Sequence, residues 1–513
     1  MPPEEAVVID GGPLAAEAVV AVARRGAPVR LSPDAVAAME RSRNLVEDHL
    51  RGQRTVYGLT TGFGALADVR IPPEDVALLQ RNLIRSHAAG AGELLEPEIV
   101  RAMMLLRART LAAGWSGVRP RLALALVDLL NHRIHPAVPS RGSVGASGDL
   151  AQLAHVALAL MGEGRVLGAS GTAPAAEALA AAGLDPVALE AKEGLAMING
   201  TDGMLSLGIL AHHDATTLLR TADVAAAMTV EGALGTDRPF AEDLQRLRPH
   251  PGQQDSAANL RALLDASPII ASHRESAHAV QDPYSMRCAP QVHGAARDVH
   301  GFCGRVLERE GASVIDNPVI LPDGRVESTG NFHGEPVGYA LDVLAVGLTG
   351  LASISERRTY WLLGPATGRG LPPFLSTRPG LGSGYMLAQY TQAALVSECK
   401  VLSSPATLDS IPTSGTQEDH VSMGWLAGLK LRQVLERART VVAIEALCAA
   451  QALDLHAPLE AAPGTRSAAA ALRERVPFLS EDRELASDIA AAEDLVRHGT
   501  LVAAAEVAAG PLR

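Results

Sequence analysis

Long helical patterns dominate the second half of the chain and restrict the folds that it can adopt. Apolar residues recur at helical spacing over residues 204–234, 336–363, 386–403 and 418–455. The last pattern would make about ten turns, whereas the average globular helix makes about three. Very long antiparallel helices pack side by side, and such bundles often complete their cores by assembling. The sequence therefore predicts a mainly α protein, built as an elongated bundle of long antiparallel helices.

Composition agrees with closely packed helices. Hydrophobic residues make up 47% of the 513-residue chain but aromatic residues only 3%, so the core must be built mainly from Ala, Leu and Val. The net charge of -12 and the lack of Lys or Arg runs argue against nucleic acids and anionic membranes as partners. The uncharged stretch within residues 339–356 is short and rich in Gly and Ser, which argues against a membrane span.

Cysteine usage and the N-terminus indicate the compartment. Cys288, Cys303, Cys399 and Cys448 lie far apart and form no Cys-x-x-Cys pair, which argues against a disulfide framework or a zinc ribbon. The first residues lack the basic and apolar regions of a signal peptide. We therefore expect a soluble cytoplasmic protein.

The N-terminal region has a different pattern from the rest of the chain. Residues 6–31 predict a small strand–turn–helix–strand unit, and Ser32 followed by Pro33 predicts the start of a helix that runs to Leu50. No linker or internal repeat marks a boundary. We expect a smaller mixed N-terminal domain over residues 1–204 and a long-helix bundle with a helical tail over residues 205–513.

The stretch Ser140–Asp149 carries an unusual run of small residues, Gly-Ala-Ser-Gly, over positions 145–148. Because Gly148 has no Cβ, its amide nitrogen could turn back toward the carbonyl of Ala146. Closing that ring and losing water, with the Ser147 hydroxyl, would leave a methylidene carbon that is a strong electrophile. Taken alone, the run is more typical of a glycine-rich turn in which Ser147 or Asp149 caps the following helix. A phosphate-binding loop would need a lysine that is absent here.

Six further blocks contain polar or aromatic residues, and all but one of them include glycine. By itself Tyr57 is more often a core aromatic residue, His87 is more often structural, and Asn199 could end a helix. Gln281, Tyr284 and Arg287 recur every three residues, which predicts one face of a helical turn that could bind an amino acid carboxylate. The blocks are Tyr57-Gly-Leu-Thr-Thr-Gly-Phe-Gly, Ser86-His-Ala-Ala-Gly, Asn199-Gly-Thr, Gln281-Asp-Pro-Tyr-Ser-Met-Arg-Cys, Gly330-Asn-Phe-His and Gln417-Glu-Asp-His-Val-Ser-Met-Gly.

With the segment Gly142–His155, these blocks closely resemble the family of histidine and aromatic amino acid ammonia-lyases, in the order that the family has them. The resemblance implies an aspartase/fumarase-like helical fold and a homotetramer whose active sites are built from several subunits. It also implies that Ala146, Ser147 and Gly148 form a methylidene-imidazolone, with no external cofactor and no metal.

The resemblance further implies roles for individual residues. Tyr57 would be the base that removes the β-proton, and the pKa of its phenol would have to be lowered for this. Tyr284 and Asn199 would line the electrophile. Arg287 would bind the substrate carboxylate, with Gln281 nearby.

Two polar residues indicate the substrate. An imidazole offers both a donor and an acceptor, so His87 and Glu418 would pair with it, whereas a phenyl ring would leave them unpaired. Phenylalanine ammonia-lyases typically have apolar residues near the first position and Gln near the second. We therefore expect histidine as substrate and urocanate and ammonia as products, at the first step of histidine degradation. We also expect Phe332 in the wall of the site.

Three alternatives stay open at this level. A tyrosine ammonia-lyase or an aminomutase would share most of these residues. A non-catalytic helical assembly protein would need none of them. A metalloenzyme is disfavoured because no His-Glu-x-x-His pattern occurs and His212 and His213 are adjacent rather than on one helical face.

One position departs from the family pattern, because Gln152 stands where the family usually has proline. This position falls in the first turn of the expected helix, where the missing N–H of proline is harmless. We therefore expect the helix to form with Gln152 as well.

Overall fold

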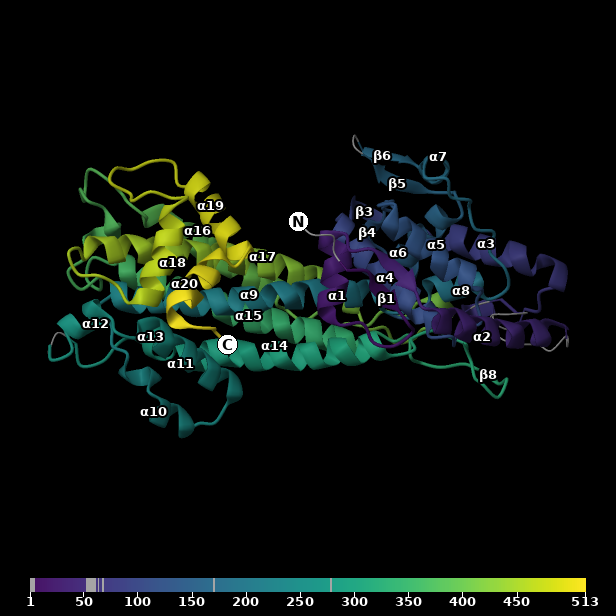
Figure 1. Ribbon diagram of the computed structural model, residues 1–513, viewed down its shortest axis with the longest axis horizontal. Coiled ribbons are helices and arrows are strands. Elements are labelled where there is room, and N and C mark those ends of the chain that lie inside the picture. The colour runs from purple at the N-terminus through teal and green to yellow at the C-terminus, as the bar shows by residue number, and fades with distance from the viewer. Residues whose placement is uncertain (1–4, 52–60, 63, 67–68, 169–170, 277–278) are drawn as a thin grey trace. The chain divides into compact units, whose positions relative to one another are not determined.

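The computed structural model describes residues 5–51, 61–62, 64–66, 69–168, 171–276 and 279–513 (Figure 1). Helices account for most of these residues, so the predicted mainly α fold is confirmed. The α-helices are α1 Ala16–Val20, α2 Pro33–Arg51, α3 Val76–His87, α4 Pro97–Ala112, α5 Pro120–Asn131, α6 Leu150–Leu160, α7 Ala175–Ala181, α8 Glu193–Ile198, α9 Asp202–Gly232, α10 Glu242–Arg246, α11 Pro251–Leu264, α12 Pro268–Ser272, α13 Tyr284–Arg287, α14 Ala289–Ala312, α15 Glu335–Leu363, α16 Met386–Leu402, α17 Gly424–Leu455, α18 Pro463–Arg473, α19 Ala486–Arg497 and α20 Thr500–Ala509.

Short strands form four two-stranded sheets within the described residues. The predicted N-terminal unit is present: β1 pairs in parallel with β2, and α1 with a short π-helix, η1, lies between them in sequence. The other three pairs are antiparallel. The strands are β1 Val7–Ile9, β2 Val29–Leu31, β3 Ala91–Leu94, β4 Pro139–Arg141, β5 Arg165–Gly168, β6 Gly171–Pro174, β7 Val319–Ile320 and β8 Val326–Glu327, and the remaining short helices are η1 Ala21–Arg25, η2 Gly64–Leu66, η3 Pro73–Asp75, η4 Arg238–Phe240, η5 Pro373–Leu375 and η6 Ser414–Thr416.

The chain divides into two compact units that are each built from separate segments. Unit 1 comprises residues 1–210, 304–341 and 405–429, and unit 2 comprises residues 211–303, 342–404 and 430–513. The divisions fall inside the long helices α9, α14, α15 and α17 and between α16 and η6. The predicted domains, 1–204 and 205–513, stay a prediction, since compactness alone does not test which segments fold independently.

Helix α4 lies at the centre of unit 1, and its residues from Ile99 to Ala112 are all buried. Its buried arginines donate hydrogen bonds to backbone carbonyls, and Arg107 also forms an ion pair with Asp202. Arg101 donates to the carbonyls of Val22 and Leu130 at 2.8 and 3.0 Å. Because a buried guanidinium needs such partners, these arginines fix the chain around α4.

A buried charge network joins the four long helices within unit 2. Glu445 on α17 accepts hydrogen bonds from Arg358 on α15 and from Thr229 on α9. Arg358 Nη1 lies 3.2 Å from Nε2 of His293 on α14, and His293 Nδ1 lies 2.7 Å from Asp223 on α9. Removing one member would leave another charge buried without a partner, which is strongly destabilising. The network therefore specifies how these helices meet.

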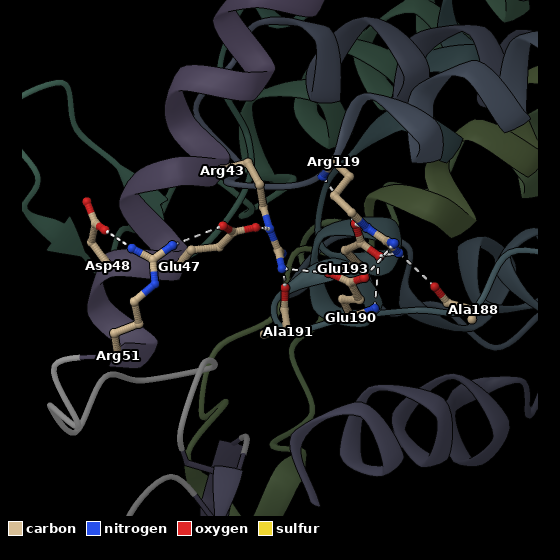
Figure 2. A network of polar contacts seen from close by, with 9 residues as sticks. All are labelled: Arg43, Glu47, Asp48, Arg51, Arg119, Ala188, Glu190, Ala191 and Glu193. Atoms are coloured by element: carbon tan, nitrogen blue, oxygen red, sulfur yellow. Dashed lines mark hydrogen bonds and ion pairs between the residues drawn. The ribbon is translucent and has the colours of Figure 1, made fainter. Parts of the chain in front are cut away.

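A second ion-pair network lies in unit 1 at the start of α8 (Figure 2). Arg119 Nη2 donates to Glu193 Oε2 at 2.7 Å, and Arg119 Nη1 donates to Glu190 Oε1 at 2.6 Å. Arg43 binds the other oxygen of Glu190 at 2.8 Å and the Ala191 carbonyl at 3.0 Å. The turn before α8 is thereby attached to both α2 and the start of α5.

Two expectations about elements are wrong. Helix α17 begins at Gly424 rather than at Glu418, because the preceding segment runs irregularly and ends at Met423 with a φ of 52°. The polar, proline-bearing sequence of residues 235–256 is typical of a surface loop, but the structure places η4, α10 and the start of α11 there. Pro239 and Pro251 stand at the second position of η4 and the first position of α11, where a missing N–H is tolerated.

Helix α15 has the length that its apolar pattern predicts and is strongly apolar. By length and composition alone it could cross a membrane, with a mean hydropathy of 1.7, but 61% of that apolar window is buried inside the protein. This degree of burial is typical of a core helix in a globular protein.

Candidate active site

The loop between β4 and α6 has an unusual backbone at the Ala-Ser-Gly triad. Ser147 has a φ of 51°, and Gly145 and Gly148 have φ values of 73° and 79°. A left-handed conformation is uncommon for serine and destabilises the folded state by roughly 1–3 kcal/mol. Ala146 is 4% exposed, so the triad is held inside the protein rather than in a free turn. The surroundings must therefore impose this conformation.

Gly148 lies against the backbone of Gly200. A Cβ at position 148 would lie 1.9 Å from the carbonyl oxygen of Gly200, which no side chain could tolerate. The Asp149 amide donates to the same carbonyl at 2.8 Å. Position 148 therefore admits only glycine.

Asp149 closes the other side of the loop. Its Oδ2 accepts from the Met204 amide at 2.7 Å, and its Oδ1 accepts from Ser143 Oγ at 2.9 Å. Complete burial raises the pKa of Asp149 to about 7, although these hydrogen bonds oppose the shift. Ser143 Oγ also accepts from the Gly145 amide at 3.0 Å, so one hydroxyl joins both ends of the loop.

Two distant segments of unit 1 cover the loop. The Gly145 carbonyl accepts from Ser422 Oγ at 2.9 Å and from the Gly334 amide at 3.0 Å. The Met423 amide donates to the Val144 carbonyl at 2.8 Å. Residues 418–423 are used in this way, which is why they do not extend α17.

The same segment brings Glu418 to the triad. Ser147 Oγ donates to Glu418 Oε1 at 3.3 Å, and Thr413 Oγ1 donates to Glu418 Oε2 at 2.7 Å. His87, at the end of α3, feels the charge of Glu418, which partly offsets the effect of burial on its imidazole. Burial dominates and lowers the pKa of His87, so the neutral imidazole is favoured. Glu418 therefore contacts Ser147, and His87 is close enough to Glu418 for their charges to interact.

Asn199 follows α8 and is 2% exposed, which confirms the predicted buried amide. Its Nδ2 donates to the Asn317 carbonyl at 2.8 Å, and its own backbone carbonyl accepts from the buried Arg107 at 3.1 Å. Asn199 Oδ1 has no hydrogen-bond partner among the described residues. It is next to Gly200 in sequence and thus borders the loop.

Phe332 belongs to the segment that covers the loop. It is half-buried and stands two residues before Gly334, whose amide binds the Gly145 carbonyl. Its predicted place in the wall of the site stays a prediction.

The remaining predicted residues lie in unit 2. Arg287 and Tyr284 are in α13, and the Arg287 guanidinium lies 4.7 Å from the centroid of the Tyr284 ring. Gln281 precedes this helix, so the predicted single helical face for the three residues is wrong. Gln281 and Arg287 instead line one pocket of about 350 Å³ that also contains Arg274. Arg287 Nε is buried and has no hydrogen-bond partner among the described residues, which leaves the side chain able to bind an anion.

Tyr57, the predicted base, lies outside the described residues.

Comparison with known protein families decides the class of the protein. The model of the aromatic amino acid lyase family matches residues 14–474. The chain belongs to this family.

Curated relatives agree with this membership of the aromatic amino acid lyases. Histidine ammonia-lyase of Streptomyces coelicolor is 52% identical over 509 residues, which cover 99% of each protein. Histidine ammonia-lyase of Anaeromyxobacter dehalogenans is 54% identical over 506 residues, which cover 97% of this chain and 99% of the relative.

Solved structures of lyases and aminomutases share the fold of this chain. Histidine ammonia-lyase from Trypanosoma cruzi has a TM-score of 0.91 and 40% identity, covering 98% of this chain and 95% of that one. Tyrosine aminomutase from Streptomyces globisporus has a TM-score of 0.94 and 36% identity, covering 99% of this chain and 100% of that one. The likeness extends over nearly the entire length of each protein.

The residues of this lyase-family chain fit an electrophile made from the triad. Ring closure needs the nitrogen of residue 148 to approach residue 146, and the positive φ values at Ser147 and Gly148 bend the chain in a tight turn. The contact with Gly200 excludes any side chain that could obstruct this approach. The free Asn199 Oδ1 is a polar atom that a reacting group could engage.

The sequence analysis did not single out several residues that shape this lyase site. Thr413, Ser422 and Arg107 bind Glu418, Gly145 and Asn199 respectively. Ser422 lies within the block that begins at Gln417, but nothing in the sequence indicates that it binds Gly145. Thr413 and Arg107 lie outside every block and had no local signal.

Proposed function

We propose that this protein is a histidine ammonia-lyase that converts L-histidine to trans-urocanate and ammonia, the first step of histidine degradation. The observation that carries the proposal is the contact of Glu418 with Ser147, together with the electrostatic interaction between Glu418 and His87. A carboxylate accepts a hydrogen bond from an imidazole N–H, and a neutral histidine can donate to or accept from the other ring nitrogen. A phenyl ring would leave both groups without partners.

Ala146, Ser147 and Gly148 form the methylidene-imidazolone in this proposal, with no external cofactor or metal. The group supplies a carbon electrophile that captures electrons from the substrate and makes ammonia a better leaving group. Everything else is supplied by side chains of the protein.

The side chains bind the amino acid and move its proton. Arg287 binds the carboxylate, with Gln281 beside it, and Tyr284 and Asn199 line the electrophile. Tyr57 removes one proton from the β-carbon. The C–N bond breaks as the C=C bond forms, so that one histidine yields one urocanate and one ammonia.

We also propose a cytoplasmic homotetramer in which each active site takes residues from several subunits. Tyr339, Val343 and Val346 follow one another along α15 at helical spacing, and they are 49%, 40% and 50% exposed in the single chain. An apolar stripe of this kind supports burial against another copy of the chain.

The test offers L-histidine, L-tyrosine and L-phenylalanine in parallel to the purified protein. Near-ultraviolet absorbance of the unsaturated acid and release of ammonia are followed together. We expect urocanate and ammonia in equal amounts from histidine and little product from the other two. Formation of a β-amino acid without release of ammonia would instead indicate an aminomutase. Formation of cinnamate or coumarate would contradict the assignment of histidine as the substrate. Activity with none of the three would leave an aminomutase with another substrate or a non-catalytic assembly protein, and an intact mass that lacks two waters would favour the enzyme.

A further inference from the structure

The short helix α8 is held at both ends by two adjacent residues of another segment of unit 1. Lys192 precedes the first residue of α8, and its Nζ donates to Asp316 Oδ2 at 2.7 Å. Asn199 follows the last residue, and its Nδ2 donates to the Asn317 carbonyl at 2.8 Å. The Asn317 amide donates in turn to Asp316 Oδ1 at 2.7 Å. The Lys192 ammonium and the Asn199 amide are therefore both held by the adjacent residues Asp316 and Asn317.

The ion pair at the start of α8 is completely buried. Lys192 and Asp316 are both 0% exposed, and Lys192 has a φ of 75°, which lysine rarely adopts. Apolar residues of similar size often stabilise a fold as well as a buried ion pair does. Stability alone therefore gives little reason for a charged pair here. The pair is better explained by the fixed geometry that it gives to Lys192 and Asp316.

The Asn199 amide at the other end presents an unused acceptor. Its Oδ1 is buried and has no hydrogen-bond partner among the described residues. Such a group destabilises the fold by about 1–3 kcal/mol unless something binds it. The amide cannot exchange its two ends without breaking the bond from Nδ2 to Asn317. Its orientation thus depends on the position of Asn317.

Asn317 is held in place by Asp316 and by the chain that follows. Thr329 Oγ1 donates to the Asp316 carbonyl at 3.2 Å, and the Thr329 amide donates to Asn317 Oδ1 at 2.8 Å. Among the described residues, Lys192 is the one cation that forms an ion pair with Asp316, and the guanidinium of Arg107 acts on the same carboxylate only at longer range. Moving Asp316 would therefore move the acceptor that orients Asn199.

We propose that Lys192 and Asp316 are positioning residues of the lyase reaction, which hold the Asn199 amide with Oδ1 directed at the reacting amino acid. The inference rests on the proposed function, in which Asn199 lines the electrophile. Neither residue touches the substrate. Their effect reaches the reaction through Asn317 and Asn199.

The test removes both charges together, because a single substitution would leave a buried ion without its partner. Lys192→Met/Asp316→Asn keeps the acceptor for the Asn317 amide and loses only the ion pair. We expect kcat to fall by about 10–100-fold, the usual effect of losing a residue that orients a functional group, with KM changed less. The near-ultraviolet band of the electrophile should be unchanged.

A matched control removes the neighbouring ion pair at the start of the same helix. Arg119→Met/Glu193→Gln breaks the contact drawn in Figure 2 and leaves the path from Lys192 to Asn199 intact. This variant should keep kcat within about twofold, since its residues do not reach Asn199. An equal loss of kcat in the control would mean that any loosening of α8 suffices, which would overturn the proposal.

A cycle with Asn199→Ala separates positioning from a structural role. The neutral pair should lower kcat in the wild-type background and have little further effect when Asn199 is already alanine. The same loss in both backgrounds, or no loss in either, would overturn the proposal. If the neutral pair does not fold, Lys192→Gln/Asp316→Asn is used, which also removes both charges but can keep a hydrogen bond between the two side chains, and it should show a smaller loss with the same dependence on Asn199.

The cycle uses whichever of the three aromatic amino acids the wild type converts. A wrong substrate therefore overturns the proposed function without affecting this result. Wild-type levels of kcat in Asn199→Ala would overturn the role of Asn199 and this proposal with it, while leaving histidine as the substrate. A wild type that converts none of the three overturns both.

Discussion

Ser147 Oγ lies 3.3 Å from Glu418 Oε1, although the two residues are 271 positions apart in the sequence. The first belongs to the triad that forms the electrophile in our proposal, and the second to the pair that would recognise imidazole. Substrate recognition and the reactive group therefore meet within unit 1. Each of the predictions below changes one side of this arrangement or its support.

Ser147→Ala should abolish activity, with a loss of at least about a thousandfold, because the hydroxyl lost during dehydration is no longer there. The protein should still fold and assemble. Urocanate formation, the near-ultraviolet band and the intact mass measure the outcome, and the wild type alone should lack two waters. Ser140→Ala, in β4 just before the loop, is the control. Full activity of Ser147→Ala would disprove the assignment of the triad.

Glu418→Gln should lower kcat/KM for histidine by roughly a hundredfold, since the proposed partner of the imidazole loses its charge. The near-ultraviolet band should stay, because the triad is intact. Thr413→Val should have a smaller effect of about fivefold, as it frees one oxygen of Glu418 but keeps the carboxylate. Parallel kinetics with histidine and phenylalanine measure both. Unchanged discrimination in Glu418→Gln would show that specificity lies elsewhere.

Gly148→Ala should prevent folding or lower the free energy of unfolding by more than about 4 kcal/mol, because its Cβ would lie on the Gly200 carbonyl. Gly183→Ala is a matched control. Gly183 has a similar φ of 69°, but nothing lies within 4 Å of a Cβ there. Backbone strain alone should cost this control about 1–2 kcal/mol. Denaturant unfolding distinguishes the two, and equal effects would mean that the contact with Gly200 is not decisive.

The pKa of Asp149, raised to about 7 by burial, should make stability depend on pH. Between about pH 4 and pH 7 the folded state binds this proton and the unfolded state does not, so stability falls as pH rises through that range. The slope is at most about tenfold in the folding equilibrium constant per pH unit. Asp149→Asn should remove this contribution, so its loss of stability relative to wild type should be larger at pH 5 than at pH 7. Unfolding curves at both pH values measure the difference, and a constant difference would contradict the shift.

Two inactive variants should restore activity when they are expressed together, if active sites are shared between subunits. Ser147→Ala keeps the predicted site residues of unit 2, which include Arg287. Arg287→Met keeps the triad of unit 1. Mixed tetramers should exceed either variant alone by at least about tenfold, since some sites would receive an intact residue from each. Ser147→Ala with Glu418→Gln should restore less, because both residues lie in unit 1 and 3.3 Å apart. Equal restoration by the two pairs would contradict shared sites.

Much of the fold follows from local patterns. The spacing of apolar residues correctly predicted long helices at α9, α15 and α16, because a helix of this length displays its buried face in its own sequence. The predicted start of α17 was wrong for a physical reason. Residues 418–423 have helical spacing, but their polar atoms and backbone bind the triad loop instead.

The sequence by itself determined the mainly α fold, the candidate triad and the blocks that resemble the lyase family, since each is written in neighbouring residues. Only the tertiary structure decided that Gly200 faces Gly148, that Thr413 holds Glu418, and that Lys192 and Asn199 share a support. These are contacts between segments far apart in the chain, and the spacing of residues within one segment carries no information about the other. The conformation of Ser147 is likewise imposed by its neighbours in space, which is why the triad alone could not be told from a helix-capping turn.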